Sequence, residues 1–410
     1  MTPRATAARR NGKLKAAPLS VDWLFSGTTL HRFSNEIRDR THLHIGDRAP
    51  DHYAPVLQPG QLERIISQRP EGLREHLKLI RRDTHYDRSA GPHGVARQLH
   101  DAFGQGFTIS LSGIATFWQP IARLCTAVSA HLNSLVSATA FLTPADEQGF
   151  PGHFDAYDTF ILQIDGEKTW RLYEPEVALP LERHWYEIKD VDARTPRTSL
   201  TLKPGDLLYL PRGTPHIASA TGRSSLHLSL VLVPYTWRDL LVDLIDEAAD
   251  LDVELRRWAS VTPAHDAPLP KFRQLAALLT RASVAGALER ARERMVESLV
   301  PLSGEPLARQ STTVAVAPED RLRRDDNIVL SVRPRGRRVV LTCPGDGFDA
   351  PLAAASALRF MANGPPEFAM RDVPGPLSAA SNCLLATRLV RMGLLQIASR
   401  RRRAPGKRGA

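Results

Sequence analysis

The chain has 410 residues and a mass of 45.4 kDa, which exceeds one ordinary domain and predicts two or three structural units. Hydrophobic residues make up 42% of the sequence and charged residues 24%, a composition typical of globular proteins that excludes wholesale disorder. The three cysteines, Cys125, Cys343 and Cys383, have no CxxC spacing. This excludes a disulfide scaffold and a cysteine zinc ribbon, and it fits a reducing compartment.

The positive charge is concentrated at the two ends of the chain. The sequence has 54 basic and 44 acidic residues, a formal net charge of +10. Residues 1–16 and 398–410 hold eleven of the basic residues and no acid, so the rest of the chain carries about −1. We interpret these segments as a solvated basic leader and a solvated basic tail, and we predict no specific DNA binding.

Neither secretion nor membrane insertion is predicted. The first residues are basic but lack the apolar core of a signal peptide, and no stretch approaches the roughly 18 apolar residues of a membrane span. We therefore expect a cytoplasmic protein with no membrane partner.

Residues 17–235 are predicted to form the first structural unit. Its early part, to about residue 100, mixes short apolar clusters with two stretches of helical spacing, residues 60–66 and 73–80. From about residue 107 to 235, runs rich in Ile, Leu, Thr and aromatic residues alternate with Pro-Gly, Asp-Gly and Thr-Gly pairs. This pattern is typical of short strands and turns.

The clearest local element is a predicted β-hairpin. Two strand-like runs, residues 159–164 (TFILQI) and 167–173 (EKTWRLY), flank the pair Asp165-Gly166. An Asp-Gly pair adopts the positive φ angles that a tight hairpin turn requires. We therefore expect the two runs to pair with each other.

Helical spacing replaces the strand pattern from Thr236. Leucines and isoleucines recur every three or four residues to Trp258, and a second helical run covers residues 271–299. The spacing leaves open whether the apolar stripes are covered by the same chain or by a second copy. Residues 301–326 are polar and contain proline, which predicts a linker. Strand-like and helix-like segments over residues 327–397 predict a small α+β domain.

Most common catalytic motifs are absent, including GxxxxGK[ST], GxGxxG, GxSxG and HExxH. What remains is His153-Phe154-Asp155, followed by His216 at the end of PGDLLYLPRGTPH, residues 204–216. Residues i and i+2 of an extended chain point to one face, so His153 and Asp155 present an imidazole and a carboxylate together. Two imidazoles and one carboxylate leave three positions of a metal open, which is the arrangement of non-haem Fe(II) sites. An HxD pair alone also arises often by chance among ordinary polar surface residues.

Other polar residues of the same region have alternative interpretations. Asp158 is the rival carboxylate, but its odd spacing from His153 points it to the opposite face of a regular strand. His227 is interpreted as a core or rim histidine. Ser229 and Tyr209 either line the site or form hydrogen bonds within the predicted β region.

The motifs around these residues resemble those of JmjC-domain proteins of the ribosomal-oxygenase type. The resemblance is carried by residues 149–155 (GFPGHFD), 160–173 (FILQIDGEKTWRLY) and 204–216. It is strong over residues 139–235, and the order of parts agrees more loosely over residues 20–400. It implies a mainly β double-stranded β-helix, the jelly roll of cupin and JmjC proteins. A helical dimerisation region at 236–300 and a winged-helix-like α+β domain at 327–397 would follow, in a homodimer.

The resemblance also implies a cofactor and a cosubstrate, Fe(II) and 2-oxoglutarate. His153, Asp155 and His216 match the iron ligands, and Lys168 matches the basic residue that pairs with the distal carboxylate of 2-oxoglutarate. Thr139 lies where members of the family often place an asparagine near the cosubstrate, so the role of its hydroxyl is left open.

Lys168 can be interpreted without the resemblance as well. A lysine inside a buried strand is costly unless an anion pairs with it, whereas a solvent-facing lysine needs no partner. Arg171 and Arg212 are the nearest alternative cations.

The resemblance implies the hydroxylation of a side chain in a protein or peptide substrate, such as a ribosomal protein, with 2-oxoglutarate and O2 converted to succinate and CO2. One alternative is an oxygenase that acts on a natural product or a precursor peptide. Another is a JmjC scaffold that binds metal without turnover. Lys168 favours an oxygenase over a scaffold, because a barrel that only binds metal needs no cation for a distal carboxylate.

Overall fold

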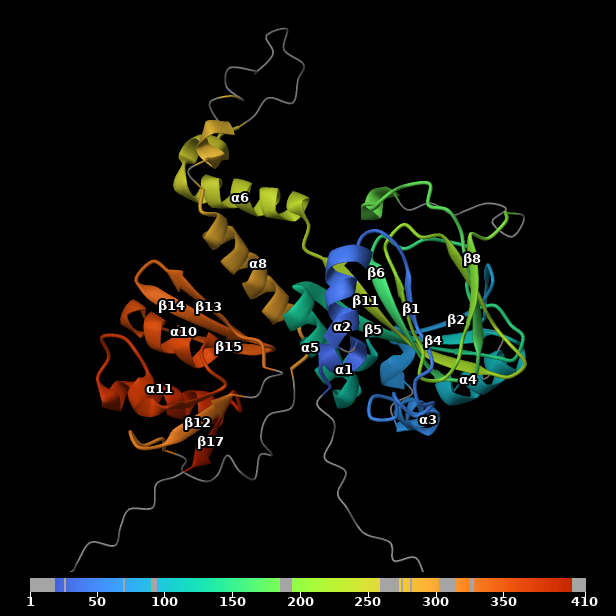
Figure 1. Cartoon of the computed structure of the whole chain (residues 1–410), viewed down its shortest axis with the longest axis horizontal. Helices are drawn as coiled ribbons and strands as arrows, with labels where there is room; N and C mark the ends of the chain where they lie inside the picture. Colours follow the sequence, from blue (N-terminus) through green and yellow to red (C-terminus); the bar gives the residue numbers. More distant parts are fainter. Residues whose placement is uncertain are drawn as a thin grey trace, which may run out of the picture.

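The structure is a computed structural model that describes residues 19–25, 27–68, 71–89, 94–184, 194–258, 273, 276–280, 282–301, 315–324 and 328–399. It contains a β-rich N-terminal part and a smaller C-terminal part, with the helices α6 (Trp237–Leu251) and α8 (Val284–Ser298) between them (Figure 1). Within the described residues, no helix combines the length and the apolar character needed to cross a bilayer. The predicted basic leader and almost all of the predicted basic tail lie outside the described residues.

Two antiparallel sheets form the N-terminal part. The larger sheet contains β1 (Leu43–Ile45), β2 (Leu77–Arg81), β3 (Thr84–His85), β4 (Thr108–Ser112), β5 (Ser134–Thr143), β6 (Asp158–Asp165), β9 (Leu207–Leu210) and β11 (Ser225–Pro234). Their order is β1-β9-β6-β11-β5-β4-β2-β3. The smaller sheet has the order β10-β7-β8, with β7 at Lys168–Leu172, β8 at Thr198–Leu202 and β10 at His216–Ala220. This architecture is consistent with the predicted cupin-like double-stranded β-helix.

The larger sheet packs one face against the main hydrophobic core and turns the other face, which carries both polar and apolar side chains, toward the interior. In β11, Leu226, Leu228, Leu230 and Leu232 are buried in the main hydrophobic core, whereas the alternate residues line an interior pocket. Successive side chains of a strand point to opposite faces, so one strand supplies both surfaces. The outer face is covered by helices, among them α1 (Val21–Phe25), α2 (Gly27–Arg32) and α5 (Gln119–Leu132) (Figure 1).

Two helix predictions have different outcomes in this part. The predicted helix at residues 60–66 is confirmed as α3 (Pro59–Gln68). The predicted helix at residues 73–80 is wrong, because a short 3-10 helix at Glu71–His76 leads into strand β2, which pairs with β4. Pairing with the neighbouring strands β4 and β3 overrides the helical spacing of the leucines there. The helices α4 (Val95–Gly104) and α5 were not predicted from the sequence.

The predicted hairpin at Asp165-Gly166 is wrong in its pairing. The runs form strands β6 and β7, but β6 pairs with β11 and β9, while β7 pairs with β10 and β8. Gly166 has φ +66°, and a Cβ there would collide with the backbone oxygen of Ser224. The turn therefore carries the chain from one sheet to the other. It places the first residue of β7, Lys168, across the interior from the larger sheet.

The helical region begins as predicted at Thr236. The Thr236 hydroxyl and the Asp239 carboxylate form a capping box at the start of α6. Arg294 of α8 donates two hydrogen bonds to the buried carboxylate of Asp243 on α6, at 2.6 and 2.7 Å, which joins the two helices. The predicted second helical run starts at residue 271, but much of it before residue 282 lies outside the described residues.

The C-terminal part contains strands and helices around its own core, in agreement with the predicted α+β content. Two three-stranded sheets have the orders β16-β12-β17 and β13-β14-β15. The elements are β12 (Arg321–Arg324), β13 (Ser331–Arg335), β14 (Arg338–Cys343), β15 (Asp346–Pro351), α10 (Ala355–Asn363), β16 (Glu367–Ala369), α11 (Ala379–Arg391) and β17 (Leu395–Ser399). The predicted linker 301–326 is too long at its end, because β12 pairs within this part. The winged-helix-like character of the C-terminal part stays a prediction.

Candidate metal centre

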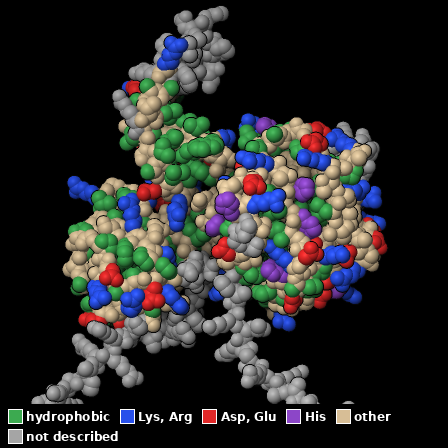
Figure 2. Space-filling model, viewed as in Figure 1, with side chains coloured by type: hydrophobic (Ala, Val, Ile, Leu, Met, Phe, Trp, Pro, Cys, Tyr) green, Lys and Arg blue, Asp and Glu red, His purple; other side chains and the backbone are tan. Residues whose placement is uncertain are grey.

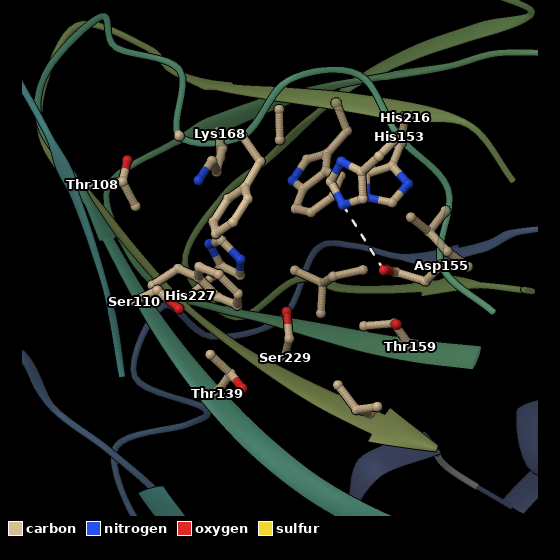
Figure 3. Close-up of a pocket in the computed structure, with 18 of the residues that line it drawn as sticks. Thr108, Ser110, Thr139, His153, Asp155, Thr159, Lys168, His216, His227 and Ser229 are labelled. Carbon is tan, nitrogen blue, oxygen red and sulfur yellow. Dashed lines mark ion pairs between the residues drawn. The ribbon is translucent and has the colours of Figure 1, made fainter. Parts of the chain in front are cut away.

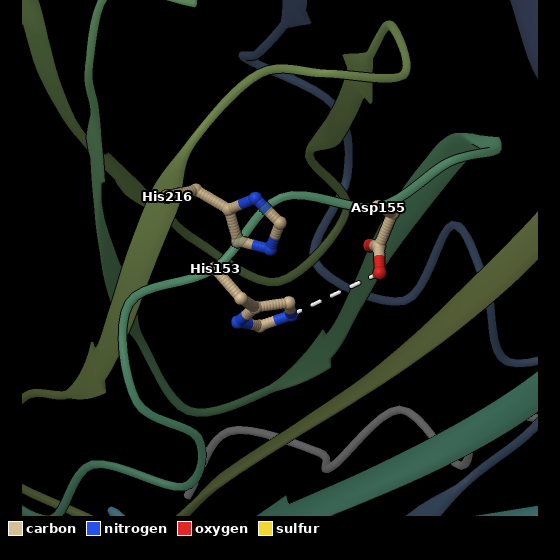
Figure 4. Close-up of side chains that lie close together, drawn as sticks. All are labelled: His153, Asp155 and His216. Atoms are coloured by element: carbon tan, nitrogen blue, oxygen red, sulfur yellow. Dashed lines mark ion pairs between the residues drawn. The ribbon is translucent and has the colours of Figure 1, made fainter. Parts of the chain in front are cut away.

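His153, Asp155 and His216 come together at one end of the barrel interior (Figure 4). His153 and Asp155 lie just before β6, and His216 is the first residue of β10. The backbone N–H of His216 donates to the carbonyl of His153 at 2.8 Å, and this bridge sets the two imidazole centroids 4.6 Å apart. One potential ligand atom from each of the three residues lies within 4.8 Å of the others.

Both histidines have one ring nitrogen fixed by the backbone. Nδ1 of His153 lies 2.8 Å from the carbonyl oxygen of Pro151, and Nδ1 of His216 lies 3.0 Å from that of Thr214. A carbonyl can only accept, so Nδ1 is the donor in each neutral ring and Nε2 keeps its lone pair. Orientation of a metal-binding imidazole through its second nitrogen is typical of protein metal sites.

Burial keeps the His216 ring neutral. Loss of solvent, with a smaller effect of the neighbouring His153, lowers the pKa of His216 to about 4. The side chain is 8% exposed. A neutral imidazole is the form that binds a metal ion, so no proton competes for Nε2 near neutral pH.

A hydrogen-bond network around Asp158 holds the loop that leads to His216. The buried carboxylate of Asp158 accepts hydrogen bonds from the backbone N–H of Arg212 at 2.9 Å and from the Tyr209 hydroxyl at 3.2 Å. The guanidinium of Arg212 also pairs with Asp39 at 2.9 Å. Asp158 thus lies apart from the three potential ligands, as its spacing predicted. Tyr209 bonds within the barrel and does not line the pocket.

Lys168 is buried at the opposite end of the same interior pocket (Figure 3). It is 3% exposed, and its Nζ donates to the Thr143 hydroxyl at 2.9 Å. Among the described residues no carboxylate lies within ion-pair distance of it. Burial lowers the pKa of Lys168 to about 7. A buried cation with only neutral partners is costly, so this end of the pocket is suited to an anion.

Hydroxyl groups line the wall between the two ends. Thr139 on β5 and Ser229 on β11 are cross-strand partners, and both face the pocket (Figure 3). The buried Thr159 hydroxyl and the indole N–H of Trp170 have no hydrogen-bond partner among the described residues. Such unsatisfied buried polar atoms are uncommon in proteins and indicate a wall that contacts a polar ligand.

The pocket has a volume of about 210 Å³. Sequence reasoning assigned His153, Asp155, His216, Lys168 and Thr139 to the site, and all five line the pocket. Ser229, for which two roles were left open, and His227, interpreted as a core or rim histidine, line it as well. It missed Tyr157, whose hydroxyl bonds to Asp155, and the small polar residues of β4. The available signal was the alternation of polar and apolar residues along the strands. The remaining lining residues include Lys78, Thr108, Ser110, Ser112, Phe141, Phe150, Ile161 and Trp170.

Comparison with known proteins gives one family and several relatives. Residues 114–240 match the model of the JmjC domain. The chain is 28% identical over 235 residues to the bifunctional lysine-specific demethylase and histidyl-hydroxylase NO66 of Dictyostelium discoideum, covering 56% of this chain and 46% of that protein. It is 39% identical over 168 residues to ribosomal oxygenase 2 of Bos taurus, covering 39% of this chain and 36% of that protein. The chain thus spans less than half of these curated relatives.

Solved structures of YcfD, a ribosomal oxygenase from Escherichia coli, share the fold. The structure of YcfD in complex with cobalt and 2-oxoglutarate aligns with a TM-score of 0.52 and 16% identity, over 90% of this chain and 98% of that chain. A complex with cobalt and succinic acid aligns with a TM-score of 0.53. The chain is therefore similar to JmjC domains over residues 114–240, and it is similar to the ribosomal oxygenases in sequence across that region and in fold across most of its length.

Proposed function

We propose that this protein is an Fe(II)- and 2-oxoglutarate-dependent oxygenase that hydroxylates a side chain of a protein or peptide. The observation that carries the proposal is the combination of two features in one pocket. A set of two imidazoles and one carboxylate lies at one end, and a buried lysine without an acidic partner among the described residues lies at the other.

The first feature fits iron. Nitrogen and carboxylate donors suit Fe(II), and ligation by His153, Asp155 and His216 would leave open coordination positions. Iron bound there would supply the oxidation chemistry, in which 2-oxoglutarate and O2 give succinate and CO2 while one oxygen atom enters a substrate C–H bond. The carbonyls of Pro151 and Thr214 would hold both imidazoles in the tautomer that presents Nε2 to the ion.

The second feature fits the cosubstrate. Lys168 would pair with the distal carboxylate of 2-oxoglutarate, which provides the counter-charge that the described protein residues do not. The hydroxyl of Thr139 would contribute a weaker contact from the neighbouring wall. Arg171 and Arg212 are poorer candidates. Arg171 lies three residues after Lys168 in β7, so its side chain points to the opposite face of the strand. Arg212 already pairs with Asp39 and Asp158.

The relatives favour a protein substrate. Proteins named as ribosomal oxygenases and as a histidyl-hydroxylase align with the JmjC domain of this chain, and the matched fold includes YcfD with 2-oxoglutarate. These names support an oxygenase over a scaffold that only binds metal. A ribosomal protein is the first substrate to test.

The proposal includes a two-fold dimer formed through the helical region. Hydrophobic side chains gather on the surface over α6 (Figure 2), where Trp237 is 83% exposed, Leu241 57% and Ile245 47%. An apolar surface of this kind is typical of an interface between chains. Light scattering of wild type should give twice the chain mass, and Leu241→Glu should give the monomer mass. Leu384→Glu, at a 72% exposed leucine of α11, is the matched control and should leave the dimer intact.

The substrate class is tested by mass spectrometry. Ribosomal proteins and candidate peptides are incubated with the protein, Fe(II), 2-oxoglutarate and ascorbate, and a parallel sample contains the His216→Ala variant. We expect the mass increase of one oxygen atom on a side chain with wild type alone. Succinate formation without any such product on ribosomal proteins would instead favour a natural product or a precursor peptide as substrate.

A further inference from the structure

His227 of β11 is a buried histidine whose ring is held between aromatic side chains. It is 3% exposed. Its ring stacks on Phe141, with centroids 4.8 Å apart and planes 10° apart, and meets the edge of Trp170 at 5.6 Å. These two contacts fix the plane of the imidazole. Rigid placement of this kind is what an oriented hydrogen-bonding group requires.

The His227 ring has no hydrogen-bond partner within the described part of the chain. Its Nδ1 is fully buried and unpaired, although the side chain lines the pocket. A buried imidazole without partners costs free energy comparable to a lost hydrogen bond, so packing alone does not explain a histidine here. Phenylalanine would provide the same stacking without that cost.

The position of His227 indicates its ligand. The ring lies at the Lys168 end of the pocket (Figure 3), and the Trp170 ring contacts both His227 and His216. Burial, together with the nearby Lys168 and His216, lowers the pKa of His227 well below its usual value. The ring is therefore neutral and keeps one N–H to donate. A cation and a neutral donor side by side form a site for a carboxylate group.

We propose that His227 is a second cosubstrate-binding residue, which donates a hydrogen bond to the distal carboxylate of 2-oxoglutarate beside Lys168. The inference rests on the proposed function, because it assumes that 2-oxoglutarate occupies this pocket. Lys168 supplies the positive charge, and the hydrogen bond from His227 orients the distal carboxylate. The pair would then select 2-oxo acids that end in a carboxylate against those of equal length that end in a methyl group.

The test compares two ligands and three proteins. 2-Oxoglutarate and 2-oxopentanoate have the same chain length, but only the first has a distal carboxylate. Their affinities for the manganese-loaded protein are measured by calorimetry without oxygen, so no turnover is involved. The variants are His227→Phe, which keeps the stacking and removes the donor, and His227→Gln, which restores an N–H donor.

We expect His227→Phe to bind 2-oxoglutarate about 10- to 100-fold more weakly, the range for one hydrogen bond to a charged group. Its affinity for 2-oxopentanoate should stay within about twofold of wild type, and His227→Gln should recover part of the loss. An equal loss for both ligands, or no loss for either, would overturn the inference while leaving the proposed function intact. A wild-type protein that binds no 2-oxoglutarate would overturn both.

Discussion

The two ends of the pocket differ in the exposure and in the hydrogen-bond partners of their functional side chains. At the metal end, His153 and Asp155 are 25% and 23% exposed, and backbone carbonyls fix the rings of His153 and His216. At the other end, Lys168 is almost fully buried and bonds only to the Thr143 hydroxyl. At the first end, the three proposed ligand atoms already lie within 4.8 Å of one another. The second end carries a charge that the described residues do not neutralise.

Because of this difference, variants at the two ends should affect turnover and 2-oxoglutarate affinity separately. Under the proposed function, a variant at the metal end removes a ligand, so it should lose turnover. A variant at the lysine end would remove the charge proposed to contact the cosubstrate, so it should lose binding of 2-oxoglutarate while the metal stays bound. The predictions below test this separation, beginning with the largest effect.

Replacement of His216 by alanine should abolish turnover of 2-oxoglutarate and weaken metal binding, because it removes one of three protein ligands. The fold should persist, since His216 lies at the end of β10 within an already paired sheet. Succinate assays, metal titration and circular dichroism measure the three quantities. His131→Ala, at an exposed histidine of α5, is the control. A His216→Ala protein with full activity would show that the ligand is a different residue.

Replacement of Lys168 by alanine should weaken 2-oxoglutarate binding by about 2 to 4 kcal/mol, or roughly 30- to 1000-fold, with little change in metal affinity. The cause is the loss of a charge-assisted contact to the distal carboxylate. Calorimetry with manganese-loaded protein measures both affinities. Arg171→Ala changes the neighbouring cation on β7 and should leave them unchanged. Weaker 2-oxoglutarate binding in Arg171→Ala, with unchanged binding in Lys168→Ala, would assign the cosubstrate contact to Arg171.

The affinity for 2-oxoglutarate should depend on pH through Lys168. Burial lowers its pKa to about 7, so the free protein loses this charge as the pH rises through that value. Binding of the dianion requires the charged form. Affinity should therefore be constant below about pH 7 and fall by up to about tenfold per pH unit above it. In Lys168→Arg the guanidinium stays charged, so a slope that persists in this variant would assign the titration to another group.

Replacement of Asp158 by asparagine should have a smaller, indirect effect. It weakens the bonds that hold the backbone of Arg212 and the Tyr209 hydroxyl, so the loop before His216 is less well fixed. We expect metal affinity to fall by about tenfold. Asp39→Asn removes the 43% exposed partner of the same arginine and should change metal affinity by less than about twofold. Equal effects of the two variants would mean that the network does not position the loop.

Local patterns, read together with the family-like motif before His216, indicated the three residues of the metal end. The i, i+2 spacing of His153 and Asp155 and the turn-rich string before His216 pointed to the three side chains that the structure brings together. Lys168 needed the resemblance to a known family. His227 was interpreted as a core or rim histidine, because its stacking on Phe141 and its place at the Lys168 end of the pocket depend on how the strands pair. Such contacts have no signature in the local sequence.

The errors in the predicted secondary structure and strand pairing also come from contacts between strands that are distant in the sequence. Asp165-Gly166 satisfies the backbone of a hairpin turn equally well when the two strands belong to different sheets. The leucines before β2 have helical spacing, yet pairing with β4 determines the outcome. Local patterns thus predicted elements and turns, while partners across the barrel decided how they were joined.

The central claim is that iron and 2-oxoglutarate react in this pocket, and succinate formation tests it most directly. Purified protein is supplied with Fe(II), ascorbate, O2 and 2-oxoglutarate, and succinate is quantified against a metal-stripped control. We predict succinate above the control even without a substrate, and none above it in His216→Ala. Succinate no greater than the control in wild type would contradict the oxygenase and favour a barrel that binds metal without turnover.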